Sequence, residues 1–193
     1  MTGELDQLGV ALVVGAALEA AGAQWMIGGS VATSAYGEPR ATHDVDLVSD
    51  LRISGVPPFV EALGDAFYVD ADVVRDAARR RASFNVIHFL TTEKIDVFCT
   101  GERFAAHGLQ HRRFLTLPDG RTAPVAAPED MVVEKLRWFR RGGEVSDRQL
   151  RDVRGVLQVL GHTLDQVRMR RWAAEVGVSD LLERELEDGT PSD

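Results

Sequence analysis

Two aspartates one residue apart, Asp44 and Asp46, are the residues whose types and spacing most clearly suggest chemistry in this chain. In a β-strand, residues i and i+2 point to the same face, so a strand here would place the two carboxylates side by side. Two like charges that close together repel each other, and a cation relieves the repulsion. Because Mg²⁺ binds in proteins through one or two carboxylates together with substrate phosphates, the pair predicts a Mg²⁺ site that would also accept Mn²⁺.

A glycine turn precedes the two aspartates. Gly28, Gly29 and Ser30 follow the apolar segment 24–27 and precede a helical pattern at 31–36, for which Ser30 is a suitable N-cap. A strand, a turn and a helix N-terminus in this order gather free backbone N–H groups and the positive end of a helix dipole, which together bind phosphate. A phosphate-binding turn followed by a carboxylate pair indicates phosphoryl or nucleotidyl transfer.

Asp96 is a third candidate carboxylate. It stands between Ile95 and Val97 in a predicted strand at 94–99, where an aspartate without a partner would be costly to bury. If that strand lies beside the one at 44–49, all three carboxylates converge, and two metal ions about 3.5–4 Å apart would clamp an in-line displacement. The simpler alternatives are an exposed strand edge for the first two aspartates and an arginine-paired structural carboxylate for Asp96.

Four further residues are weaker candidates. Arg40 and Thr42 stand just before the aspartate pair, where they could contact a triphosphate and steady the carboxylates, or simply make a salt bridge and a turn hydrogen bond. Lys135 has apolar neighbours on a predicted helix at 128–141, so it either lays its stem along them or directs its ammonium into a polar cleft. Asp152 most simply supports a helix that begins near residue 146.

These motifs resemble those of the polymerase-β-type nucleotidyltransferases, which carry a glycine turn, a spacer, an Asp-hydrophobic-Asp pair and a later strand aspartate. With Gly29 and Ser30 as the turn pair, residues 31–43 form the spacer, and Gly28 stands where a hydrophobic residue is usual. More narrowly, the chain is similar to AbiEii-type toxins and related bacterial nucleotidyltransferase-like proteins. The blocks that carry this resemblance are 27–30, 36–42, 44–48, 134–138, 146–148 and 151–153.

The resemblance implies roles for the candidate residues. Asp44, Asp46 and Asp96 would hold Mg²⁺, and Asp96 would act as the general base. Lys135 would contact the triphosphate of the NTP, and Asp152 would hold Lys135 or a substrate group. The reaction would move a nucleoside monophosphate from the NTP to an acceptor hydroxyl and release pyrophosphate.

The acceptor stays open at this point. The AbiEii-like resemblance implies a toxin that acts on tRNA or another cellular target and has an antitoxin partner. The enzymatic alternative is a small-molecule acceptor, such as an aminoglycoside or lincosamide antibiotic, since an acidic protein suits a cationic substrate. The alternative from another class is a non-catalytic nucleotide-binding or partner-binding protein that kept the fold.

Composition limits these alternatives only in part. The 193-residue chain has 22 Lys and Arg against 30 Asp and Glu, a net charge of −8, which disfavours a broad nucleic-acid-binding surface. Arginine clusters at 79–81 and 137–141 would still allow a local basic rim. No apolar run reaches the ~18 residues of a spanning helix, the first residues do not resemble a signal peptide, and the lone Cys99 suits a reducing compartment. We therefore expect a cytoplasmic protein without a membrane segment.

Hydrophobic periodicity predicts an α/β (α+β) fold in which a nucleotidyltransferase-type mixed-sheet core, 1–127, carries a C-terminal helical region, 128–193, packed on it. The predicted strands are 24–27, 44–49, 67–69, 84–90, 94–99, 114–117 and 122–125. The predicted helices are 5–21, 31–36, 57–63, 73–81, 103–109, 128–141, 146–160, 163–176 and 179–186.

Overall fold

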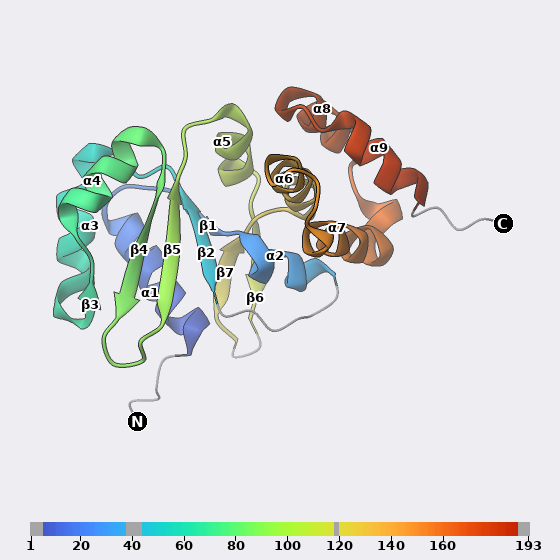
Figure 1. Ribbon diagram of the computed structural model, residues 1–193. Helices are drawn as coiled ribbons and strands as arrows, with labels where there is room; N and C mark the ends of the chain where they lie inside the picture. Colours follow the sequence, from blue (N-terminus) through green and yellow to red (C-terminus); the bar gives the residue numbers. More distant parts are fainter. Residues whose placement is uncertain (1–5, 38–43, 118–119, 189–193) are drawn as a thin grey trace. The chain divides into compact units, whose positions relative to one another are not determined.

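The computed structural model describes residues 6–37, 44–117 and 120–188 (Figure 1). Seven strands in these ranges form one mixed sheet in the order β3-β4-β5-β2-β1-β7-β6. Neighbouring strands are antiparallel except for the pairs β2/β5 and β1/β7, which are parallel. The strands are β1 (Trp25–Ile27), β2 (Val45–Ser49), β3 (Phe67–Tyr68), β4 (Ser83–His88), β5 (Lys94–Cys99), β6 (Arg113–Thr116) and β7 (Thr122–Val125).

The described residues fall into two compact units. The first, called the sheet unit below, holds the described residues of Met1–Gly29 and Thr42–Val125. The second, called the helical unit, holds those of Ser30–Ala41 and Ala126–Asp193. The segment that follows the glycine turn therefore groups with the C-terminal helices, whereas the sequence places it in the core region.

Helices cover one face of the sheet in the sheet unit. Helix α1 (Gln7–Ala20) contacts β1, β2 and β5, helix α4 (Ala71–Arg80) contacts β4, and helix α3 (Val56–Leu63) packs on both helices. Burial alternates along the central strands because successive side chains point to opposite faces. Along β5, Ile95, Val97 and Cys99 are buried, whereas the side chains between them are partly exposed. The sheet unit also contains α5 (Arg103–Gln110).

The helical unit is built around α6 (Pro128–Arg141), which contacts α7 (Asp147–Leu160), α8 (Gln166–Val176) and α9 (Ser179–Asp188). Helix α2 (Gly29–Tyr36) joins this group. A Cβ atom at Gly37 would lie only 3.0 Å from the carbonyl carbon of Gly155 in α7, so a glycine lets the end of α2 approach α7 closely. In the part of the chain that the structure describes, no helix combines the length and the apolar character needed to cross a bilayer.

The predicted fold class and the order of helices and strands are confirmed, with changes at some ends. Helix α8 begins at Gln166 rather than at 163, because Gly161–Thr163 forms a short 3₁₀ helix and the Asp165 carboxylate caps α8 by accepting the N–H of Arg168. The prediction of Ser30 as an N-cap is wrong. Helix α2 already begins at Gly29, so Ser30 lies inside its first turn.

Candidate functional site

Two of the predicted site aspartates are direct neighbours across parallel strands. Asp46 of β2 and Asp96 of β5 are register partners, so their side chains leave the sheet on the same face. This face is opposite to the one that holds the buried Leu47 and Val97. The pairing of β2 with β5 therefore brings Asp46 and Asp96 together, whereas the predicted convergence of all three carboxylates is not found among the described residues.

Lys94 contacts both Asp96 and the third candidate aspartate, Asp44. Its Nζ lies 2.7 and 2.9 Å from the two carboxylate oxygens of Asp96 and 3.5 Å from Oδ1 of Asp44. The hydrogen bond from Lys94 to Asp96, together with the nearby charges of Asp96 and Asp44, raises the pKa of the ammonium above its usual value, against the opposing effect of desolvation. Lys94 is not among the residues predicted from the sequence, although its position two residues before Asp96 on one strand places both side chains on the same face.

The glycine turn lies against Asp46. Gly29 has a positive φ of 56°, and a Cβ atom there would overlap the Oδ2 of Asp46 and lie 2.7 Å from its Cγ. The N–H of Gly28 donates to the backbone carbonyl of Asp46 at 2.8 Å. Only glycine satisfies both the dihedral angle and the space at position 29, so the turn and the carboxylate form one arrangement in the sheet unit.

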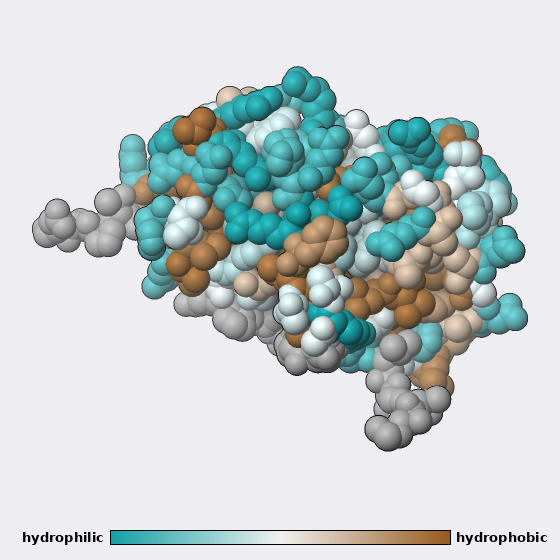
Figure 2. Space-filling model, turned by 180° about the vertical axis from the view of Figure 1, so that it is seen from behind, coloured by the Kyte–Doolittle hydropathy of each residue, from teal (hydrophilic) through white to brown (hydrophobic). Residues whose placement is uncertain are grey.

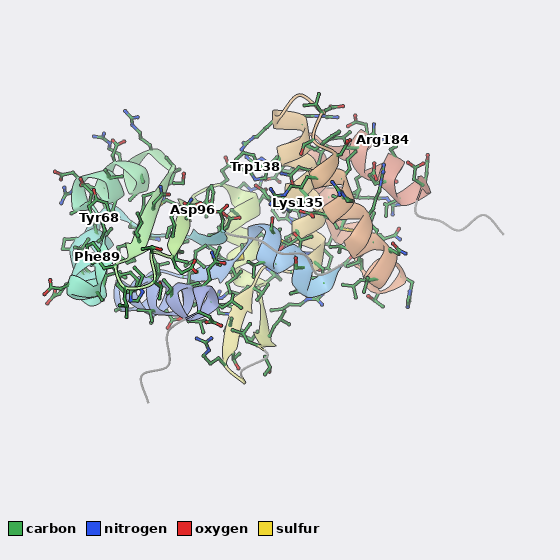
Figure 3. All side chains as sticks on the ribbon, turned by 60° about the horizontal axis from the view of Figure 1, so that its bottom comes forward. Tyr68, Phe89, Asp96, Lys135, Trp138 and Arg184 are labelled. Carbon is green, nitrogen blue, oxygen red and sulfur yellow. The ribbon has the colours of Figure 1, made fainter. Side chains whose placement is uncertain are left out.

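The helical unit holds the second group of candidates. Lys135 on α6 donates to Oδ2 of Asp152 on α7 at 2.6 Å, and both side chains are 7% exposed. Lys135, labelled in Figure 3, therefore does not run along its apolar neighbours into solvent. Its ammonium binds the buried carboxylate of Asp152. The association that the resemblance implied for these two residues is present in the structure.

Ser30 has a partner that the sequence did not suggest as a site residue. Nη2 of Arg148, on α7, lies 3.3 Å from the hydroxyl of the buried Ser30. This places a guanidinium beside the first turn of α2, within the helical unit. Arg40 and Thr42 lie outside the described residues.

The three candidate aspartates have side chains suited to binding a divalent cation, although in this structure two of them bind the ammonium of Lys94. Carboxylate oxygens are the ligands that Mg²⁺ and Mn²⁺ prefer. Asp46 and Asp96 supply them from one face of two paired strands, and Asp44 lies just before β2. Within the described ranges, no three or more His, Cys, Asp or Glu side chains stand close enough together to hold a metal ion. Two of the three aspartates instead bind the ammonium of Lys94.

Several arginines of the two clusters form ion pairs with nearby acids. Arg79 and Arg80 both pair with Asp76 on α4, and Arg137 lies 3.6 Å from Glu134. Arg140 binds Glu144 and Asp180. The face seen in Figure 2 is correspondingly mixed, with hydrophilic residues spread between separate apolar areas. These pairs reduce the positive potential that a polyanion would meet at either cluster.

Solved structures similar to this one are nucleotidyltransferases. The solution structure of the antibiotic-resistance factor ANT(2'')-Ia matches with a TM-score of 0.55 and 15% identity, over 92% of this chain and 97% of that protein. A Thermotoga maritima protein described as a nucleotidyltransferase has a TM-score of 0.47 and 15% identity, over 71% of this chain and 87% of its own. An antigenic nucleotidyltransferase-like protein from Paracoccidioides brasiliensis has a TM-score of 0.42 and 17% identity, over 92% and 91%.

Sequence comparison adds no closer relative. No protein-family model matches the chain, and no curated protein matches it either. The mixed sheet of seven strands, together with the likeness to ANT(2'')-Ia over nearly the whole of both chains, shows that this protein has a nucleotidyltransferase-type fold.

Proposed function

We propose that this protein is a Mg²⁺-dependent nucleotidyltransferase. An acceptor hydroxyl attacks the α-phosphorus of an NTP. The new bond joins the acceptor oxygen to this phosphorus, the bond from the phosphorus to the bridging oxygen breaks, and pyrophosphate leaves. The hydroxyl proton passes to a carboxylate and then to solvent.

The observation that carries the proposal is the alignment of Asp46 with Asp96 beside Gly29. The register brings two carboxylates to one face, and the glycine brings the backbone of a turn against one of them. In this arrangement an anion bound at the turn would lie next to the carboxylates. Such proximity is what phosphoryl and nucleotidyl transfer require, because their catalysis consists mostly of positioning and charge stabilisation.

Each residue has a proposed task. Bound Mg²⁺, or Mn²⁺, would neutralise the phosphates and make the acceptor hydroxyl more acidic. Asp44 and Asp46 would hold it, and Asp96 would share in holding it and accept the proton. The turn at Gly28 and Gly29 would bind the phosphates, while the N–H of Gly28 stays bonded to the backbone carbonyl of Asp46. Ser30, Lys135 and Arg148 are the proposed polar contacts of the helical unit to the nucleotide, as are Arg40 and Thr42 in the preceding loop of the sequence, with Asp152 orienting Lys135.

A labelling experiment tests the reaction. The protein is incubated with each of the four NTPs, labelled at the α-phosphate, with Mg²⁺ or Mn²⁺ and a panel of acceptors. Transfer of label to an acceptor with release of pyrophosphate supports the proposal, provided that Asp46→Asn abolishes it. Metal-dependent NTP binding without transfer to any acceptor would favour the non-catalytic alternative.

For the acceptor, we propose a cationic small molecule. Three observations support it: the net charge of −8, the ion pairs that several of the clustered arginines form with neighbouring acids, and the likeness of the fold to an antibiotic-resistance factor. The motif resemblance supports the alternative, an RNA acceptor for a toxin with an antitoxin partner. Labelled NTP offered with aminoglycosides in one reaction and total tRNA in another separates the two. Labelling of tRNA that falls steeply with salt would overturn the small-molecule proposal.

A further inference from the structure

The chain contains two lysines, Lys94 and Lys135, and its other basic residues that bear a permanent charge are arginines. Both lysines form ion pairs with candidate site aspartates. Lys94 is the exposed one of the two. Its side chain is 40% exposed, and its partners Asp96 and Asp44 are 18% and 58% exposed. The proposed function assigns no task to Lys94, although its ammonium contacts both Asp96 and Asp44.

Strand geometry explains why the ammonium reaches two carboxylates at once. Lys94 and Asp96 are two residues apart on β5 and therefore share a face. Val45, the first residue of β2, is the register partner of Ile95, so Asp44, just before β2, stands beside Lys94. A lysine ammonium is a compact charge with three rotatable donors on a flexible four-carbon stem. It can bridge two carboxylates and can also leave them without any movement of the backbone.

The ammonium of Lys94 contacts two of the candidate carboxylates, those of Asp96 and Asp44, and Asp46 is the register partner of Asp96. A divalent cation supplies twice the charge and takes up several oxygen ligands at short distance. It would therefore compete directly with the ammonium for the oxygens of Asp96 and Asp44.

We propose that Lys94 is an internal counter-cation of the candidate metal site and that the divalent metal displaces it on binding. This inference rests on the proposed function, since it assigns the carboxylates to a metal. In the metal-free protein, Lys94 positions Asp96 and limits the repulsion among the three carboxylates. When the metal binds, the ammonium leaves Asp96 and turns to solvent.

Amine acylation of the unmodified protein tests the displacement of Lys94 directly. Because the chain has only two lysines, the modification of each can be measured separately. The protein is treated briefly with an amine-acylating reagent in EDTA, in Mg²⁺ and in Mn²⁺ at matched ionic strength, and the modification of each lysine is measured by mass spectrometry. We expect acylation of Lys94 to rise several-fold with metal, because its hydrogen bonds to Asp96 are lost. Acylation of the buried Lys135 should stay the same, which makes it the internal control.

Calorimetric titration with Mn²⁺ under the same conditions distinguishes failure of the displacement proposal from failure of the proposed metal site. If the metal binds while the acylation of Lys94 does not change, the displacement proposal is overturned and the proposed metal site stands. If no metal binds at millimolar concentration, with or without NTP, both the displacement and the metal-dependent reaction are overturned.

Two variants give an independent measurement. Lys94→Met keeps a side chain of similar length and removes the charge. It should raise the affinity for Mn²⁺ several-fold. Its melting temperature should fall in EDTA and return to the wild-type value in Mn²⁺. Lys94→Arg keeps a competing cation and should not raise the affinity. Arg75→Met, which removes an exposed cation paired with Asp72 on α4, is the control for net charge and should change neither quantity. Weaker Mn²⁺ binding by Lys94→Met would overturn the proposal.

Discussion

Both lysines of this protein bind aspartate, but they do so in opposite surroundings. Lys94 bridges Asp96 and Asp44 on the open face of the sheet, where its side chain is 40% exposed. Lys135 binds Asp152 between two helices, where both side chains are 7% exposed. The bond lengths hardly differ, at 2.7 Å for the first pair and 2.6 Å for the second.

The comparison shows that distance alone does not determine what an ion pair does. An exposed pair contributes little to stability, because water solvates either ion well when the partner leaves. It can therefore open at low cost when another cation arrives. A buried pair does not have this freedom, since separation leaves an unsolvated charge. We conclude that the first pair is suited to exchange and the second to holding α6 against α7.

Asp96→Asn should have the largest effect on activity. The variant removes the proposed general base and a metal ligand, so the transfer rate should fall by roughly 10²–10⁴-fold. The free energy of unfolding should change by no more than about 1 kcal/mol, because the ammonium that loses its partner is 40% exposed and stays close to Asp44. Label transfer and urea denaturation measure the two effects on the same preparation.

Asp72→Asn is the matched control for this variant, since it neutralises an aspartate paired with Arg75 on the surface of α4. It should leave the transfer rate unchanged. Equal rates for Asp96→Asn and Asp72→Asn would remove Asp96 from the proposed site. A large loss of stability in Asp96→Asn would instead show that the Lys94 pair is structural, contrary to the comparison.

Asp152→Ala should have the largest effect on folding. It leaves the ammonium of Lys135 buried without its hydrogen-bonded carboxylate, and breaking a buried pair in this way costs about 3–5 kcal/mol. Urea denaturation followed by circular dichroism measures the loss. A variant as stable as the wild type would show that Lys135 readily finds solvent or another acceptor.

A double variant separates folding from nucleotide binding. Lys135→Met with Asp152→Leu replaces both charges by apolar side chains and should recover most of the lost stability, since such replacements are often neutral or stabilising. If Lys135 contacts the triphosphate, this folded variant should bind NTP more weakly than Arg137→Ala, which removes a neighbouring cation on the same helix. Equal binding by the two variants would leave Lys135 with a structural role only.

Gly29→Ala should have an intermediate effect, lowering both the stability of the fold and the affinity for Mn²⁺. An alanine at a φ of 56° is strained, which costs roughly 1–3 kcal/mol, and its Cβ would push the carboxylate of Asp46 away. Gly22→Ala is the control, because Gly22 has a φ of 73° with nothing within 4 Å of the added Cβ. Calorimetric titration with Mn²⁺ should show weaker binding by Gly29→Ala alone. Equal effects would mean that only backbone strain matters at position 29.

The sequence predicted the order of the helices and strands and the strand positions of Asp46 and Asp96, whereas Asp44 lies just before β2 rather than within it. Alternation around Asp46 and Asp96 indicates two strands with their carboxylates on one face, because the period of a strand is two. The proline and the apolar spacing of 128–141 predict a helix with the bounds of α6. In these segments the local pattern and the tertiary packing agree, which is the usual condition for a successful prediction.

What the sequence did not predict depends on contacts between distant segments. The pairing of β2 with β5 decides that Lys94 meets both Asp44 and Asp96, and no local pattern specifies which strands are neighbours. The approach of Arg148 to Ser30 likewise joins residues 118 positions apart. The grouping of α2 with the C-terminal helices also depends on tertiary packing, which periodicity does not encode.

The smallest expected effect concerns Cys99, which lies on the same strand as Lys94 but on its covered face. Burial raises the pKa of the Cys99 thiol from its ordinary value of 9.0 to about 11, although the charge of Arg81 lowers it in part. Between these two values the unfolded chain releases the thiol proton and the folded protein retains it. The unfolded state then binds fewer protons, so the free energy of unfolding falls as the pH rises from about 9 to about 11. Below pH 9 the thiol has no such effect.

Cys99→Val isolates this contribution, because valine has a similar volume and does not titrate. Urea denaturation at pH 8 and at pH 10.5 should show that the wild type loses about 1–2 kcal/mol relative to the variant over this interval, the part of the shift that has been titrated by pH 10.5. The other titrating groups are common to both proteins and cancel in the difference. If the difference stays constant with pH, the thiol is ionised as easily in the folded protein as in the unfolded chain. The face of β5 that holds Cys99 would then be no less polar than the face that holds Lys94 and Asp96. This result would weaken the contrast between the two faces of the strand.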